Sequence, residues 1–136
     1  MSYIKKQPKE PTFMQNGLNG YQFNLDKKGL EISYIDCFKG HDKYCRDTES
    51  TLIYYVLDGE GQYVINNENF NVQKGDVVEV PVNTEFVYAG NMKLILIMTP
   101  GFKPENNIEI KDNDLYWRYD INIIQFKIER DSNLWI

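Results

Sequence analysis

Short segments of alternating apolar and polar residues follow one another along most of the chain, and this pattern is typical of β-strands. Residues 30–35 alternate with period two, and residues 51–57 are rich in β-branched and aromatic side chains. Similar segments cover residues 21–25, 62–65, 70–72, 77–80, 86–89 and 93–98. Because these segments are short and are separated by Gly, Asn and Asp, they predict an all-β sandwich or barrel.

The polar stretches between these segments predict the turns of the fold. Residues 58–61 read Asp-Gly-Glu-Gly and predict a tight hairpin turn, since glycine readily adopts positive φ. Residues 66–69 predict a second hairpin tip, and residues 39–50 and 99–113 predict turn-rich connections. The first dozen residues predict an extended arm. Alternation returns at 121–129, which predicts an edge strand or a surface that packs on a partner subunit.

Composition and charge exclude several classes of partner. The 136 residues, 42% of them apolar, predict one domain spanning residues 1–136. The formal charge of −5 argues against nucleic acid, which needs a clustered positive surface. No apolar run approaches the roughly 18–20 residues of a membrane span, and no signal-peptide pattern is visible. The two cysteines suit a reduced compartment, so we expect a cytoplasmic protein without a membrane partner.

Two motifs resemble those of the cupin superfamily. Residues 55–61 and then 75–81 keep the family's spacing, with six residues between Leu52 and Gly59 and five residues between Gly75 and Pro81. The stretch 99–105 is similar to the one that leaves the last cupin strand. The resemblance implies an RmlC-like double-stranded β-helix, or jelly-roll barrel, with its core at about 30–105 and a C-terminal extension at 106–136. It also implies a homodimer, to which the N-terminal arm and the tail would contribute.

The resemblance further implies a divalent metal, and this sequence departs from it there. The family's two histidines, glutamate and last histidine fall on Cys45, Asp47, Leu52 and Phe86. Leucine and phenylalanine have no lone pair for a metal. We therefore predict no metal and no other cofactor at this site. An alternative, non-standard metal site would use His41, Cys45, Asp47 and Glu49, which share one loop.

The same positions predict the lining of the barrel. Residues two apart on a strand share a face, so Tyr54 should point inward with Leu52, and Tyr88 with Phe86. With Cys45 and Asp47, they would form an aromatic pocket for a small molecule such as a sugar or carbonyl compound. Alternatively, these aromatic side chains fill the barrel completely.

Three functions remain open at this stage. The first is a metal-independent cupin that binds a small molecule. The second is a sugar or nucleotide-sugar isomerase or epimerase, with His41, Tyr54 or Tyr88 as the catalytic acid or base. Cys45 is a further candidate, as a nucleophile. The third is a non-catalytic structural or interaction subunit with a filled barrel.

Overall fold

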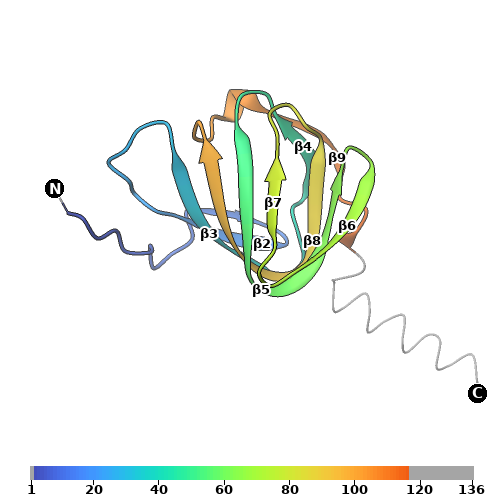
Figure 1. Cartoon of the computed structure of the whole chain (residues 1–136), viewed down its shortest axis with the longest axis horizontal. Coiled ribbons are helices and arrows are strands. Elements are labelled where there is room, and N and C mark those ends of the chain that lie inside the picture. The colour runs from blue at the N-terminus through green and yellow to red at the C-terminus, as the bar shows by residue number, and fades with distance from the viewer. Residues whose placement is uncertain (1, 117–136) are drawn as a thin grey trace, which may run out of the picture.

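The structure, a computed structural model, describes residues 2–116, and these form an almost entirely antiparallel β fold (Figure 1). Its strands are β1 Phe13–Gln15, β2 Leu18–Gln22, β3 Glu31–Cys37, β4 Lys43–Asp47, β5 Thr51–Ile65, β6 Glu68–Gln73, β7 Val77–Val80, β8 Phe86–Thr99 and β9 Asn107–Asp112. One short 3-10 turn, Pro104–Asn106, precedes β9. Among the described residues, none belongs to a helix long and apolar enough to cross a membrane.

One curled sheet contains all of these strands. Along it the order is β1-β2-β3-β8-β4-β9, and β5 pairs with β6, β7 and β8. The two longest strands, β5 and β8, pair from Thr51↔Thr99 to Ile65↔Phe86, and the sheet closes around them (Figure 1). The prediction of an all-β fold is confirmed.

Where the sequence predicted four strands around two breaks, the structure has two long bent strands. The predicted hairpin turn at 58–61 is wrong, because β5 runs through it with a bulge between Val56 and Asp58. Gly59 does have a positive φ of 84°. A Cβ at Gly59 would lie 2.1 Å from the carbonyl oxygen of Asn91 on β8. The glycine therefore allows β5 and β8 to approach each other closely where both strands bend.

Two strands lie in stretches that the sequence predicted to be connections. β4 falls within residues 39–50, and β9 falls within residues 99–113. The two pair with each other, from Lys43↔Asp112 to Asp47↔Asn107. Both are rich in polar residues, and their tertiary pairing overrides the weak local pattern. The strand predicted at 21–25 lies instead at 18–22, after a turn from β1.

Other expectations have separate outcomes. The hairpin tip at 66–69 is confirmed, with Asn66 and Asn67 both at positive φ, 49° and 66°. The alternating segment 121–129, and with it the tail that would contribute to a dimer, lies outside the described residues. The single domain over 1–136 and the homodimer stay predictions.

Candidate functional site

A cavity of about 380 Å³ lies inside the curled sheet. This volume falls at the lower end of the roughly 300–1,000 Å³ typical of small-molecule sites. The cavity is lined by residues from seven strands, and these include all of the residues that the sequence predicted to bind a ligand or to act in catalysis, namely His41, Cys45, Asp47, Leu52, Tyr54, Phe86 and Tyr88. The barrel interior is therefore open at the place where those side chains meet, and not filled by them.

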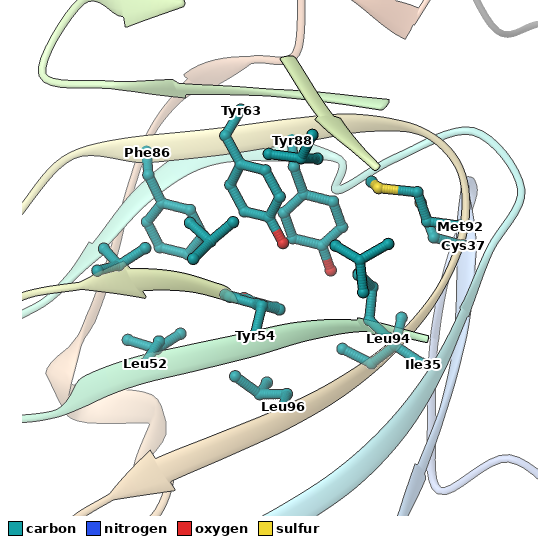
Figure 2. Packing of buried hydrophobic residues seen from close by; sticks show 14 of the residues in the cluster. Ile35, Cys37, Leu52, Tyr54, Tyr63, Phe86, Tyr88, Met92, Leu94 and Leu96 are labelled. Carbon is teal, nitrogen blue, oxygen red and sulfur yellow. The ribbon is translucent and has the colours of Figure 1, made fainter. Parts of the chain in front are cut away.

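A cluster of four aromatic side chains stands at one wall of the cavity, and three of them, Tyr54, Phe86 and Tyr88, line it. Tyr54 on β5 and Tyr88 on β8 have ring centroids 5.3 Å apart in an edge-to-face arrangement. Tyr63 stacks on Tyr88 at 5.0 Å, and Phe86 lies 6.0 Å from Tyr54. In Figure 2 the hydroxyl groups of Tyr63 and Tyr88 point in the same direction. Each of these four side chains is at most 2% exposed, so the wall is rigidly packed.

The tyrosine hydroxyls on this wall stay protonated. Burial raises the pKa of Tyr54 and of Tyr88 well above the ordinary value. A hydrogen bond between the two side chains opposes the rise for Tyr54. The two phenols can thus donate hydrogen bonds to a ligand, but they are poor bases. Glu79, an alternative partner for a buried tyrosine, faces outward on β7 and is exposed.

His41 stands beside this wall with a fixed tautomer. Its Nδ1 lies 2.8 Å from the carbonyl oxygen of Lys43, and since a carbonyl only accepts, Nδ1 carries the hydrogen. Its Nε2 lies 3.2 Å from the side-chain nitrogen of Gln15. The Gln15 oxygen accepts the backbone N–H of Asp42 at 2.8 Å, so its NH₂ group faces His41. Nε2 therefore holds an unprotonated lone pair.

The surroundings of His41 also keep its ring neutral. The residue is partly buried, and its burial lowers the pKa of the imidazole below the ordinary value. The hydrogen bond to Lys43 and the nearby carboxylates of Asp42 and Glu109 oppose this effect without cancelling it. The ring centroid lies 5.7 Å from that of Tyr88. A neutral imidazole next to a protonated phenol is a base paired with an acid.

Residues that follow β9 hold the backbone around His41 in place through hydrogen bonds. The Asn113 side-chain amide donates to the carbonyl oxygens of both His41 (2.7 Å) and Tyr88 (3.0 Å). The Asn113 backbone N–H donates to the carbonyl of Asp42 at 2.9 Å. The Tyr116 hydroxyl lies in hydrogen-bonding contact with the Gly40 carbonyl and the Asp42 carboxylate. These bonds fix the backbone on both sides of the imidazole.

Sequence reasoning missed several polar residues of the cavity, among them Gln15 and Glu109. Gln15 lies between the predicted extended arm and the first predicted strand, and no local pattern distinguishes it. Glu109 lies on β9 opposite Cys45, so the two share a face. The alternation of Ile108 and Ile110 with polar residues could have revealed this strand. Its polar face lines the cavity and its two isoleucines are exposed. This arrangement is the reverse of the usual one, in which the apolar face of a strand points inward.

Cys45 is unsuited to nucleophilic attack. Burial raises the pKa of its thiol to about 12, and the carboxylates of Glu109 and Asp47 add to the rise. The nucleophilic form of cysteine is the thiolate, which needs nearby positive charge. The Cys45 thiol therefore stays protonated and contributes only surface to the cavity.

The residues present do not fit the divalent metal of the cupin family. Leu52 and Phe86 line the cavity at two of the four corresponding positions and offer no donor. Glu49, proposed for a non-standard site, is exposed. Within residues 2–116, no three side chains of His, Cys, Asp or Glu gather so that they could hold an ion. Metal independence stays a prediction, and no step below depends on a metal.

Sequence comparison finds a short matching segment in a second protein. No protein-family profile matches the sequence. The uncharacterized protein MJ1618 of Methanocaldococcus jannaschii is 47% identical over 58 residues. The matched segment spans 40% of this chain and 46% of that protein, which is less than half of either.

Structural comparison identifies the fold. Pac13 of Streptomyces, a nucleoside dehydratase, matches with a TM-score of 0.76 and 20% identity over 82% of this chain and 93% of its own, in a histidine-to-glutamine variant with uridine. Two more Pac13 structures with uridine carry a tyrosine-to-phenylalanine replacement each. An RmlC-like cupin from Shewanella frigidimarina matches with a TM-score of 0.58 and 19% identity over 71% of this chain and 96% of its own. The chain thus has a cupin-type fold, as its motifs predicted.

Proposed function

We propose that this protein is a metal-independent lyase that removes water from the sugar of a nucleoside-like molecule. The observation that carries the proposal is the neutral imidazole of His41, whose Nε2 lone pair is fixed beside Tyr54 and Tyr88 in one cavity. An elimination requires a base and hydrogen-bond donors that reach the same bound sugar, and this cavity provides both.

The spacing of these three residues supports the assignment. In the Pac13 variants with uridine, the replaced histidine and the two replaced tyrosines lie 13 and 34 positions apart along the chain. His41, Tyr54 and Tyr88 are likewise 13 and 34 positions apart. At 20% identity the two proteins share few other residues, so the agreement in residue type and spacing favours a shared chemistry.

The chemistry can be written with the residues of the cavity alone. A sugar C–H bond becomes acidic enough for an imidazole only when a carbonyl group adjoins it. His41 Nε2 takes that proton, and the electron pair of the broken C–H bond forms a C=C bond. The neighbouring C–O bond breaks, and its hydroxide leaves as water with the proton returned by the imidazolium. Tyr54 and Tyr88, which stay protonated, donate hydrogen bonds to the oxygens that gain charge.

Gln15 has to release the lone pair for this step. Its bond to His41 is 3.2 Å long, at the weak end of the usual range. Gln15 ends β1, a strand of three residues whose one partner in the described part of the chain is β2. A bound ligand therefore has to replace only the contact between the Gln15 nitrogen and Nε2, while the Gln15 oxygen can keep its bond to the Asp42 N–H.

The test has a binding step and a turnover step. Uridine is titrated into the untagged protein by NMR, and nucleosides whose sugar carries an aldehyde or a ketone are then incubated with it. We expect uridine to bind, and mass spectrometry to detect loss of one water from a carbonyl-bearing nucleoside. His41→Gln should abolish turnover and leave uridine binding within a few-fold, because only the proton transfer is lost. Tyr54→Phe and Tyr88→Phe should each slow turnover.

Tyr63→Phe is the matched control. Tyr63 belongs to the same aromatic cluster, but it does not line the cavity and its hydroxyl has no partner among the described residues. Turnover should therefore match that of the parent. Deuterium uptake from D₂O without loss of water would indicate an epimerase or isomerase and contradict the proposal, as would undiminished turnover by His41→Gln.

A further inference from the structure

Asp47 lines the cavity and carries a buried carboxylate oxygen that has no partner among the described residues. The residue is 5% exposed and lines the cavity from β4. Its Oδ1 accepts the backbone N–H groups of Glu49 (2.9 Å) and Ser50 (2.7 Å), which fixes the turn into β5. Its Oδ2 is buried and has no hydrogen-bond partner among the described residues. A buried oxygen of this kind is unfavourable until a donor reaches it.

The pairing of β4 with β9 gives this part of the wall a defined chemistry. Cys45 lies opposite Glu109, and Asp47 lies opposite Asn107, so all four side chains share one face. All four line the cavity. Arg46 lies between Cys45 and Asp47 in the strand and therefore points to the other face. The nearest cation in the sequence thus makes no contribution to the cavity.

The charge of the whole cavity has one sign. Within residues 2–116, its lining includes three carboxyl groups, those of Glu31, Asp47 and Glu109, and neither a lysine nor an arginine. Burial lowers the pKa of His41, so the imidazole adds no positive charge near neutral pH. A phosphate or carboxylate ligand would therefore meet like charges and find no cationic partner.

We propose that Asp47 is the residue that determines specificity in this cavity, and that it selects an uncharged, unphosphorylated ligand. Its Oδ2 accepts a hydrogen bond from a hydroxyl or N–H group of the ligand, and Glu31 and Glu109 repel anionic derivatives. The inference rests on the proposed function and narrows its substrate class to free nucleosides, as opposed to nucleotides. The carboxylates can also accept bonds from the sugar hydroxyls, which a phosphate group cannot offer.

Uridine and uridine 5′-monophosphate are the probes that test this inference. Each is titrated by calorimetry into the full-length protein near pH 7.5, where the phosphate carries close to two charges. We expect uridine to bind at least tenfold more tightly than its monophosphate. Asp47→Asn replaces the unpaired acceptor with a donor or removes its charge. This variant should bind uridine at least tenfold more weakly than the parent protein. Glu109→Gln should reduce the factor by which uridine binds more tightly than its monophosphate.

Asp76→Asn is the matched control for Asp47→Asn. One oxygen of Asp76 also accepts a backbone N–H within a turn, that of Gln73 at 2.9 Å, but the residue lies outside the cavity. Its uridine affinity should equal that of the parent. If Asp47→Asn fails to fold, the inference is tested by the relative affinities of the parent protein and of Glu109→Gln for uridine and its monophosphate.

The two proposals fail in distinguishable ways. Equal affinity for uridine and its monophosphate, or undiminished uridine binding by folded Asp47→Asn, overturns the inference and leaves the dehydration proposal standing. Tight binding of uridine with the expected preference, but no loss of water from any carbonyl-bearing nucleoside, overturns the dehydration proposal alone. Absence of binding by either probe overturns both.

Discussion

Replacing Gln15 with alanine should raise the pKa of His41. The Gln15 NH₂ group can bond only to the unprotonated Nε2, so it stabilises the neutral ring against the imidazolium. The amide cannot turn over to serve the imidazolium, because the Asp42 N–H holds its oxygen at 2.8 Å. One such hydrogen bond is worth about 0.5–1.5 kcal/mol net. Its loss should therefore shift the protonation equilibrium about 2- to 12-fold toward the imidazolium.

The alanine variant also admits water to the ring, and this acts in the same direction. Burial is the main cause of the lowered pKa of His41, so better hydration raises it further. The Nδ1–H bond to Lys43 is retained, and the tautomer of the neutral ring should not change.

NMR titration of the imidazole resonances measures this effect directly. The chain has a single histidine, so the untagged protein gives one set of ring signals. Gln22→Ala is the control, because Gln22 also lines the cavity from β2 but makes no recorded bond to the ring. An unchanged or lower pKa of His41 in Gln15→Ala would refute the assignment of the Gln15 amide and, with it, the free lone pair.

Two further predictions concern stability. The pKa of His41 in the folded protein lies below its unfolded value of about 6.5, so the unfolded chain binds the proton first as the pH falls. The free energy of unfolding should therefore decrease below that pH, and His41→Gln should remove this part of the pH dependence. Urea titrations at several pH values measure the effect, and identical pH profiles for the parent and His41→Gln would contradict it. Gly59→Ala should cost about 2–5 kcal/mol, because its positive φ and the Asn91 oxygen 2.1 Å from the added Cβ act together. Gly75→Ala shares the positive φ but meets nothing within 4 Å, and should cost only about 1–2 kcal/mol; equal losses in chemical denaturation would show that the contact with β8 is unimportant.

The apolar strands and the inner face of the barrel were predictable because their pattern is local. Period-two alternation placed Leu52 and Tyr54 on one face of β5, and Phe86 and Tyr88 on one face of β8, and all four line the cavity. The motif spacing supplied the fold. The local pattern could not show that β5 continues through residues 58–61. Glycines at these positions are equally compatible with a hairpin turn and with a bend between paired strands.

The polar half of the site was harder to predict because it is assembled by tertiary pairing. β9 faces the cavity with Asn107 and Glu109 only because it pairs with β4 in one register. Gln15 reaches His41 across 26 residues of sequence, through an edge strand with no periodic signal. No property of the isolated segments specifies that contact, so the lone pair of His41 could be found only in three dimensions.

A single amide outside the cavity links the backbones of His41 and Tyr88. Asn113 binds the backbone carbonyls of residues that lie 72 and 25 positions before it, and it touches the interior with neither oxygen nor nitrogen. Changes at Asn113 would move His41 and Tyr88 relative to each other without altering a single atom of the cavity lining. Attempts to adjust the distance between the imidazole and the phenol can therefore begin beyond the end of β9 and leave the pocket itself untouched.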